Sequence, residues 1–335
     1  MKAAVLGTGA WGTALAQVLA DNGWDVCCWG IVEKQVQDIR DLHTNSTYFE
    51  HLSLPRNLTA TDDLKEAIEN ASVIVVAVPS FAVRSTIEKA GPFLMKGALP
   101  VSVAKGFDPQ TGGFMSQVIR QCLPRESGCM DVVTLAGPSF AVEVAQRLAT
   151  AIVAASPTLA SAKRCQECFS NSYFRVYTND DEIGAELCGA VKNVIALAAG
   201  CLDGMGFKIN TRSALITRGL LEMDKIVVAS GGQTSTVYGL TGLGDLVLTC
   251  SSSTSRNYQL GYRIGQVGSK QALAENRNTV EGVKACELLI ERARKLGVDL
   301  PICESIYHVI YEGEDPRLVV SSLMNRPLKS EEDEE

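Results

Sequence analysis

Short apolar runs alternate with amphipathic stretches over the first half of the chain. Most of the runs are apolar throughout instead of at every second position, which is typical of parallel strands buried on both faces of a sheet. They predict strands over residues 2–6, 26–29, 73–78, 101–104, 132–135, 151–154 and 174–177. Helical patterns lie between several of them, for example at 13–21 and 64–69. This order predicts an α/β fold with a doubly wound sheet.

The pattern changes after about Asn179, where strand signals fade and long amphipathic stretches begin. They predict helices over residues 182–202, 211–230, 255–267 and 283–296, and hence a second, mostly α-helical domain. The polar cluster Asn179-Asp180-Asp181 is suited to cap the first of them, so the boundary is predicted there. We expect a first domain over 1–180, a helical substrate and catalytic domain over 181–328, and an acidic, disordered tail over 329–335.

Composition and charge narrow the function classes. The 335 residues are 46% hydrophobic and 21% charged, as in an ordinary globular protein with room for two cores. The net charge of −7 argues against a nucleic-acid partner, although the acidic run at 331–335 contributes much of it. Charges interrupt the long apolar stretches, so no membrane span is predicted. We expect a cytoplasmic protein.

The eleven cysteines do not form a disulfide or zinc framework. Cys165 and Cys168 form a C-x-x-C pair, but no second pair or histidine cluster stands at zinc spacing. We therefore predict no bound metal. The cysteines are interpreted as small buried side chains in a reducing compartment.

A glycine motif follows the first predicted strand. The run Gly7-Thr8-Gly9-Ala10-Trp11-Gly12 fits the pattern G-x-G-x-x-G and leads directly into a predicted helix. In this context Gly7 permits a tight turn, Gly9 lets the backbone approach a pyrophosphate, and Gly12 permits close packing of helix and strand. The N-terminus of the helix then offers N–H groups to phosphates. The motif predicts a dinucleotide site in a Rossmann-type domain.

The choice of dinucleotide depends on the end of the second strand. An acidic residue there favours NAD, because it binds the ribose hydroxyls, and a basic residue favours NADP. The segment Trp29-Gly30-Ile31-Val32-Glu33-Lys34 has neither at the expected position. Glu33 and Lys34 come slightly late and favour opposite answers, so NAD and NADP both stay open.

Further polar residues follow the later strands and interrupt one helix. Lys105 follows one predicted strand and Gly137-Pro138-Ser139 follows another, at the edge where doubly wound sheets bind ligands. Lys192 lies in an apolar helical stretch, where a lysine is costly unless it is paired or faces a polar cavity. A side chain that extends to the surface is the alternative, and the pattern fits both. Arg256 adds a cation suited to a phosphorylated substrate.

Taken in order, the motifs resemble those of bacterial-type NAD(P)-dependent glycerol-3-phosphate dehydrogenase over nearly the whole chain. The matching segments are 7–14, 45–48, 54–58, 78–80, 105–106, 137–145, 186–193, 214–219, 242–246, 255–257 and 280–282. The segments 242–246 and 255–257 are especially specific. Their order and spacing carry the resemblance, since any one of them alone is weak.

The resemblance implies reversible hydride transfer between NAD(P)H and dihydroxyacetone phosphate to give sn-glycerol 3-phosphate, which supplies phospholipid synthesis. It implies that Lys192 is the general acid/base, with its pKa lowered toward neutrality by burial and nearby cations, and that Lys105 polarises the substrate. The implied substrate contacts are Lys105, Gly137, Ser139, Lys192, Asp245, Ser255, Arg256 and Asn257, with Arg256 at the phosphate. The implied cofactor contacts are Gly7, Gly9, Ala10, Trp11, Gly12, Lys105, Ala141, Arg256 and Glu281.

Two departures from the family pattern affect details. Ile31 and Val32 stand where members often carry a basic or polar residue, and Lys208-Ile209 stands where many have a Gly-Asp pair. The first leaves the contacts to the adenosine ribose open, and the second adds a cation and removes an acid. We expect normal activity in spite of both.

Three other functions or mechanisms fit the sequence less well. A 3-hydroxyacid dehydrogenase of the same superfamily also has a lysine on a helix of its second domain, but Asp245 and the 255–257 run disfavour it. A non-catalytic NAD(P) sensor needs no proton donor, so Lys105 and Lys192 disfavour it. The three histidines, His43, His51 and His308, lie outside the motifs, which disfavours a histidine-based mechanism. The oligomeric state stays open, with a homodimer as one option.

Overall fold

The computed structural model of the chain describes residues 1–129, 131–328 and 330. Its contacts divide the chain into two compact units. The first comprises residues 1–192 and 223–248, and the second comprises 193–222 and the chain from 249 onward. The acidic tail predicted over 329–335 lies outside the described residues apart from Ser330.

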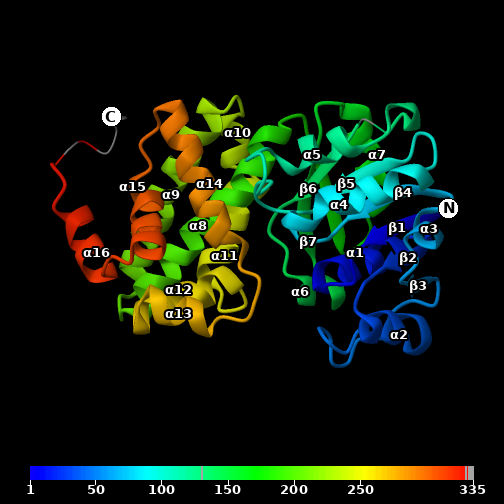
Figure 1. Cartoon of the computed structure of the whole chain (residues 1–335), viewed down its shortest axis with the longest axis horizontal. Coiled ribbons are helices and arrows are strands. Elements are labelled where there is room, and N and C mark those ends of the chain that lie inside the picture. The colour runs from blue at the N-terminus through cyan, green and yellow to red at the C-terminus, as the bar shows by residue number, and fades with distance from the viewer. Residues whose placement is uncertain (130, 329, 331–335) are drawn as a thin grey trace. The chain divides into compact units, whose positions relative to one another are not determined.

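An eight-stranded sheet forms the centre of the first unit (Figure 1). The strands are β1 (Lys2–Leu6), β2 (Asp25–Trp29), β3 (Leu58–Thr61), β4 (Ala71–Val76), β5 (Leu99–Ser102), β6 (Val133–Ala136), β7 (Thr150–Ala155) and β8 (Phe174–Asn179). They lie in the order β3-β2-β1-β4-β5-β6-β7-β8. The order reverses at β1, as it does in doubly wound sheets, so the predicted fold class is confirmed.

The sheet differs from the prediction in two respects. β7 runs antiparallel to β6, with Thr134 opposite Ala155, whereas the other neighbouring strands of this sheet are parallel. The connection over residues 137–149 contains only the five-residue helix α6 (Ala141–Ala145). β3 was not predicted, because its sequence Leu-Thr-Ala-Thr is short and half polar.

Helices cover both faces of this sheet. Along β1, Ala3 and Val5 belong to one buried cluster, whereas Ala4 and Leu6 belong to another. The first cluster includes residues of α1 (Ala10–Asp21) and α7 (Leu159–Phe169), and the second includes residues of α4 (Ser80–Ala90) and α5 (Met115–Cys122). The other helical segments before residue 180 are α2 (Glu33–Leu42), α3 (Leu64–Ile68), η1 (Gly91–Phe93) and η2 (Arg125–Ser127).

The rest of the described chain is helical, as predicted. Its elements are α8 (Glu182–Gly204), α9 (Ile209–Ala229), α10 (Thr234–Val237), η3 (Leu240–Gly244), α11 (Asp245–Ser251), α12 (Arg256–Val267), α13 (Ser269–Glu275), α14 (Glu281–Leu296), α15 (Pro301–Tyr307), η4 (His308–Glu312) and α16 (Pro316–Met324). The helices predicted over 182–202, 211–230, 255–267 and 283–296 correspond to α8, α9, α12 and α14, with ends that differ by up to two residues.

The polar cluster before α8 caps this helix, as predicted. Asp181 accepts a hydrogen bond of 2.8 Å from the backbone N–H of Gly184 in the first turn. It also accepts one of 2.8 Å from the N–H of Gln233. One carboxylate therefore joins the start of α8 to the segment that leads into α10.

Glycines bring α8 and α12 into direct backbone contact within the second unit. A Cβ atom on Gly200 would overlap the carbonyl oxygen of Tyr258, and one on Gly261 would overlap the carbonyl oxygen of Leu197. The two helices can approach this closely only because both surfaces lack side chains at these positions. The contact fixes α12, whose first residues are candidate substrate ligands.

The helix α8 is long and apolar enough to cross a membrane by length and composition. Glu186 and Lys192 interrupt its apolar run, so the sequence predicts no membrane span there. Its 18-residue apolar window is wholly buried within the protein, which is the usual position of a core helix. The helix therefore gives only weak evidence for a membrane span.

Candidate active site

The glycine motif forms the turn between β1 and α1. Gly7 has φ +127°, and a Cβ atom there would lie 2.6 Å from the carbonyl oxygen of Ala77. A Cβ on Gly12 would overlap the carbonyl oxygen of Gly7, whereas a Cβ on Gly9 would have no atom within 4 Å. Gly7 and Gly12 are thus required by packing, and the space beside Gly9 is open to a ligand.

Side chains outside the motif hold this turn in place. Asn45 donates to the carbonyl oxygen of Thr8 at 2.9 Å and to the hydroxyl of Thr13 at 2.9 Å. The hydroxyl of Thr8 in turn donates to Gln35 at 2.8 Å. Sequence reasoning gave Asn45 no role beyond a family match, because its partners are distant in the sequence.

The helix α1 begins at Ala10, so Ala10, Trp11 and Gly12 form its first turn. The first N–H groups of a helix have no acceptor within that helix and carry the positive end of its dipole. With the open space beside Gly9, this arrangement fits the pyrophosphate of a dinucleotide. The residues present are therefore those that an NAD or NADP site needs.

The end of β2 does not select between the two dinucleotides. Ile31 and Val32 follow Gly30, and their side chains are 82% and 46% exposed. Glu33 starts α2 and is itself exposed. No charged side chain lies between Trp29 and Glu33. The structure therefore fits NAD and NADP equally, as the sequence does.

Two lysines meet one carboxylate in the first unit. The Nζ atom of Lys192 lies 2.5 Å from Oδ1 of Asp245, and the Nζ atom of Lys105 lies 2.9 Å from Oδ2 of the same residue. Lys192 and Asp245 are buried, with side chains 5% and 2% exposed. Of the two interpretations open for Lys192, the paired one is correct, and the side chain does not extend to the surface.

Burial and the neighbouring charges set the protonation of this cluster. Burial lowers the pKa of Lys192 to about 7; Asp245 opposes this shift and Lys105 adds to it. Burial alone would raise the pKa of Asp245, but the charges of Lys105 and Lys192 outweigh it and hold the carboxyl pKa below its usual range. The cluster thus holds a lysine that exchanges a proton near neutral pH beside a fixed carboxylate.

Lys105 lies in the segment between β5 and α5, two residues before a closed loop. β5 ends at Ser102, two residues earlier than predicted, so Lys105 lies beyond the strand end instead of directly following it. The loop is closed by an antiparallel bridge between Phe107 and Phe114. The stem of Lys105 lies against α8, because its Cγ atom would be 3.9 Å from a Cβ atom on Gly189.

Asp245 is the first residue of α11 and directly follows the π-helical turn η3. A Cβ atom on Gly244 would lie 3.4 Å from Cγ of Pro138, so the Gly137-Pro138-Ser139 loop packs beside the Asp245 turn. Gly137 has φ +147°. A Cβ atom on it would lie only 3.0 Å from the Cα atom of Ile152. Ser139 donates to the carbonyl oxygen of Gly137 at 3.2 Å, and Ala141 starts α6 and is half-buried.

A second group of predicted residues gathers at the start of α12 in the second unit. Ser255 caps this helix by accepting the N–H of Tyr258 at 3.3 Å, and Arg256 is exposed in its first turn. Asn257 donates to the side-chain oxygen of Asn193 at 2.9 Å, and it accepts the N–H of Gly282 at 2.9 Å. Asn257 therefore ties the start of α12 to that of α14, where Glu281 is half-buried.

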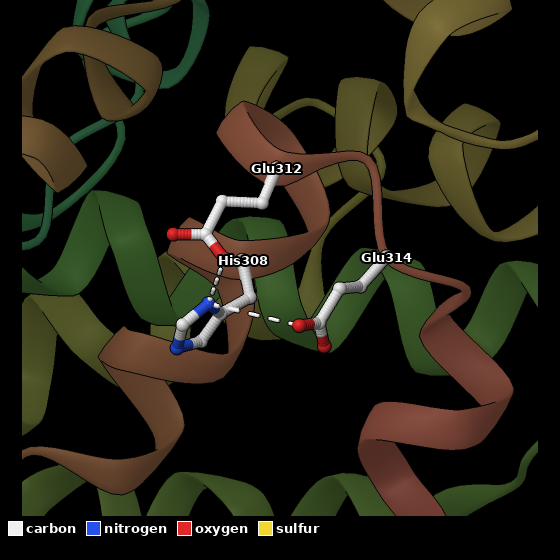
Figure 2. A group of neighbouring side chains, drawn as sticks. All are labelled: His308, Glu312 and Glu314. Carbon is white, nitrogen blue, oxygen red and sulfur yellow. Dashed lines mark hydrogen bonds and ion pairs between the residues drawn. The ribbon is translucent and has the colours of Figure 1, made fainter.

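One surface cluster has the composition of a cation site. Figure 2 shows Nδ1 of His308 pointing toward Glu312, at 2.7 Å, and toward Glu314, at 3.9 Å. The three ligand atoms lie within 4.8 Å of one another, but the two glutamates are exposed and the contact with Glu312 already engages the imidazole. None of these residues belongs to the motifs of the candidate active site, and we assign them no role in it.

Comparisons with known proteins cover nearly the whole chain. The family model described as the N-terminus of NAD-dependent glycerol-3-phosphate dehydrogenase matches residues 2–162, and the model of its C-terminus matches 181–321. Glycerol-3-phosphate dehydrogenase (NAD(P)+) of Geobacter sp. strain M21 is 46% identical over 331 residues, which cover 98% of both chains. The protein of the same name from Limosilactobacillus reuteri is 43% identical over 334 residues, again 98% of both chains.

Solved structures agree with these relatives. The crystal structure of glycerol-3-phosphate dehydrogenase from Coxiella burnetii is similar with a TM-score of 0.90 at 36% identity, covering 97% of this chain and 99% of that one. A D-mandelate dehydrogenase in complex with NADH reaches a TM-score of 0.62 at 15% identity, covering 93% and 98%. The second likeness concerns the fold alone, so it gives the hydroxyacid alternative no support beyond a shared architecture.

Proposed function

The chain belongs to the NAD-dependent glycerol-3-phosphate dehydrogenase family, and we propose that it interconverts dihydroxyacetone phosphate and glycerol 3-phosphate with Lys192 as general acid/base. The observation that carries this proposal is the buried contact of Lys192 with Asp245, to which Lys105 adds a second cation. A sensor without catalysis has no use for a buried lysine of lowered pKa.

Lys192 donates the proton in one direction of the reaction and accepts it in the other. The bound nicotinamide supplies or accepts the hydride at the substrate carbon. During reduction the substrate carbonyl oxygen gains negative charge, and Nζ of Lys192 donates a proton to it. During oxidation the same atom accepts the hydroxyl proton. A pKa of about 7 suits both directions, because the two protonation states are then similarly populated near neutral pH.

Lys105 and Asp245 set the electrostatics of this step. Lys105 is assigned to polarise the substrate carbonyl beside the reacting oxygen. Asp245 binds both ammonium groups, so it orients them and offsets part of the cost of burying Lys192. Without Asp245 the two lysines would repel each other, and the lysine of lower pKa would lose its proton more readily.

The remaining predicted substrate contacts stay proposals. We assign Gly137 and Ser139 to the substrate because their loop packs beside the Asp245 turn. We assign Ser255, Arg256 and Asn257 at the start of α12 to the substrate as well, with the exposed guanidinium of Arg256 for the phosphate. The support for this second group is the family resemblance together with the hydrogen bonds that order Asn257.

The cofactor contacts are proposed on similar grounds. The turn of Gly7, Gly9, Ala10, Trp11 and Gly12 would bind the pyrophosphate of NAD or NADP, as its open space and helix N-terminus support. Lys105, Ala141, Arg256 and Glu281 would approach the dinucleotide elsewhere. For the domains, we propose that residues 1–180 bind the dinucleotide and that 181–328 supply the proton donor and the phosphate ligands.

The cellular setting is a proposal of the same kind. All eleven cysteines are free thiols, and all but Cys122 are buried, which supports a reducing, cytoplasmic location. A homodimer is supported by apolar side chains on α16, where Leu318 and Met324 are 70% and 79% exposed. The product would supply phospholipid synthesis, as the family resemblance implies.

The test is dihydroxyacetone phosphate-dependent oxidation of NADH and of NADPH by the purified full chain. We expect turnover by the native protein and a large loss of kcat in Lys192→Ala, with cofactor binding retained in a separate fluorescence titration. Lys295→Ala, which removes an exposed lysine from α14, is the control and should retain full activity. A folded native protein that oxidises neither cofactor would contradict the proposal, and faster turnover of a phosphate-free hydroxyacid would favour the alternative enzyme.

A further inference from the structure

A buried carboxylate on α8 takes no part in the proton transfer described above. Glu186 is 5% exposed and lies about two helical turns before Lys192. We propose that Glu186 is a positioning residue, which binds Ser116 at the start of α5 and thereby holds the Lys105 loop in register with Lys192. The inference rests on the proposed function, since it concerns the two lysines to which that function is assigned.

The contact between Glu186 and Ser116 uses both carboxylate oxygens. Oε1 accepts the backbone N–H of Ser116 at 3.0 Å, and Oε2 accepts its hydroxyl at 2.7 Å. Ser116 is 1% exposed, so water does not compete for these groups. Two charge-assisted hydrogen bonds to one residue fix both the position and the orientation of the start of α5.

A second pair makes the same connection one turn further on. Arg120 donates to both oxygens of Glu182, at 2.6 and 2.8 Å. Ser116 and Arg120 are four residues apart on α5, and Glu186 and Glu182 are four residues apart on α8, in the opposite sense. The two helices are therefore joined antiparallel at two points, and α5 cannot slide along α8 without breaking both.

The start of α5 is also the end of the Lys105 loop. Phe114 precedes the first residue of α5, and it pairs with Phe107 in the bridge that closes the loop. Lys105 lies two residues before Phe107. A displacement of Ser116 would pass through this bridge toward Lys105. The contact with Glu186 instead holds the start of α5 against α8, the helix that also carries Gly189 and Lys192.

Hydrogen bonds within the loop over residues 107–114 make it stiff, so that a displacement at its α5 end also displaces its other end. Asp108 accepts hydrogen bonds from Arg84 on α4 at 2.8 Å and from the hydroxyl of Thr111 at 2.7 Å. Its backbone N–H donates to the carbonyl oxygen of Gly113 at 2.9 Å. These contacts stiffen residues 107–114 and also join them to α4. Lys105 precedes this stiffened loop by two residues, so the attachment of the loop to α5 contributes to the position of Lys105.

The contact depends on the charge of Glu186. Burial raises the pKa of Glu186 to about 7; the charge of Glu182 adds to this shift, while the Ser116 donors and Arg120 oppose it. Protonation turns one acceptor oxygen into a donor, so the contact with Ser116 is complete only in the carboxylate form. The contact weakens as the pH falls through about 7, whereas Lys192 loses its proton as the pH rises.

Glu186→Gln removes the charge and one acceptor without removing volume. Its matched control is Glu222→Gln, because Glu222 is 4% exposed and accepts the N–H groups of Ile302 and Cys303 at the start of α15. Burial also raises the pKa of Glu222 to about 7. The two variants therefore lose the same kind of buried carboxylate, and only one of them is joined to the Lys105 loop.

The first measurement is a double-mutant cycle on kcat/KM for dihydroxyacetone phosphate. We expect Glu186→Gln to lower kcat/KM about tenfold in the native background, since small displacements of a positioned group are costly. In a Lys105→Met background the same change should lower it less than about twofold, because the residue that it positions is gone. Glu222→Gln should stay within about twofold in both backgrounds. An equal loss in both backgrounds, or no loss in the native one, would overturn the inference.

The second measurement does not depend on turnover. A short pulse of acetic anhydride followed by peptide mass spectrometry reports how readily the Lys105 amine reacts. We expect Lys105 to react about threefold faster in Glu186→Gln than in the native protein or in Glu222→Gln, since its contact with Asp245 loosens. Equal rates would overturn the inference even if the enzyme is active. Faster labelling in a protein that does not reduce dihydroxyacetone phosphate would support the inference about position and reject the proposed function.

Discussion

Lys192 and Asp245 form a contact of 2.5 Å in which both side chains are almost wholly buried. A buried lysine without a partner would lose its proton outright, because burial disfavours the charged form. A perfectly matched pair would instead hold the proton too firmly for exchange. Here Asp245 is shared with Lys105, so when Lys192 is protonated two ammonium groups face one carboxylate and the cluster has a net positive charge. That excess charge suits a site in which negative charge develops on the substrate.

Replacing Lys192 tests the role of the proton donor. We expect Lys192→Met to lower kcat for the reduction by about 10² to 10⁴, the usual contribution of a general acid. The KD for NADH should change little, because the glycine turn that would bind it is untouched. Steady-state kinetics together with fluorescence titration of NADH give both quantities. A variant that keeps more than half of the native kcat would show that another group supplies the proton.

The pH dependence of the reduction follows from the pKa of the same residue. The general acid must be protonated, and burial lowers the pKa of Lys192 to about 7, so kcat should fall as the pH rises through about 7. For the oxidation, in which Lys192 must accept a proton, kcat should rise over the same interval. Stopped-flow measurement of the hydride-transfer step in both directions checks this. Parallel profiles in the two directions would contradict the assignment.

Asp245→Asn should shift this profile in a defined direction. Asp245 raises the pKa of Lys192, whereas burial and Lys105 lower it. Removing the carboxylate charge therefore lowers the pKa of Lys192 further, and the fall in the reduction rate should move to lower pH. A pKa of about 7 leaves Lys192 about half protonated at neutral pH, so each further unit of pKa lowering first reduces the protonated fraction, and with it kcat for the reduction, about fivefold. An unchanged profile would mean that Asp245 does not control the proton on Lys192.

The sequence predicts most of the fold because its strands are apolar on both faces and its helices are amphipathic. β3 was missed because two of its four residues are threonines, and β7 was expected to be parallel because local sequence does not encode strand direction.

The residues of the candidate site were predicted from the sequence, but their pairings were not. Lys105, Lys192 and Asp245 were all singled out from the sequence, but periodicity left Lys192 equally compatible with a surface position. Its pairing with Asp245 joins residues that are far apart in the chain and is visible only in the fold. The role of Glu186 was not predicted either, because a glutamate in a helix is ordinary until its partner Ser116 is known. Its place in an otherwise apolar helical stretch is the sequence signal that could have drawn attention to it.

Two glycines of the dinucleotide turn should respond differently to the same substitution. Gly9 has φ −66° and open space beside its would-be Cβ, so Gly9→Ala should leave the free energy of unfolding nearly unchanged and weaken NADH binding by filling that space. Gly12→Ala places a Cβ against the carbonyl oxygen of Gly7 and should also cost stability, about 1–3 kcal/mol. Urea unfolding and NADH titration of both variants separate the effects. Native affinity in Gly9→Ala would remove the turn from the binding site.

Gly261→Ala tests whether the backbone contact of α8 and α12 positions the start of α12. The new methyl group would overlap the carbonyl oxygen of Leu197, so the helices must separate, and we expect a loss of about 1–3 kcal/mol. Because Arg256 and Asn257 lie on the first turn of α12, the KM for dihydroxyacetone phosphate should rise while the KM for NADH changes less. Gly9→Ala is the control for Tm alone, since it adds the same methyl group where there is room for it and should keep the native Tm. If Gly261→Ala lowers Tm without raising the KM for dihydroxyacetone phosphate, the contact stabilises the second unit only, and the proposed phosphate ligands on α12 lose their main structural support.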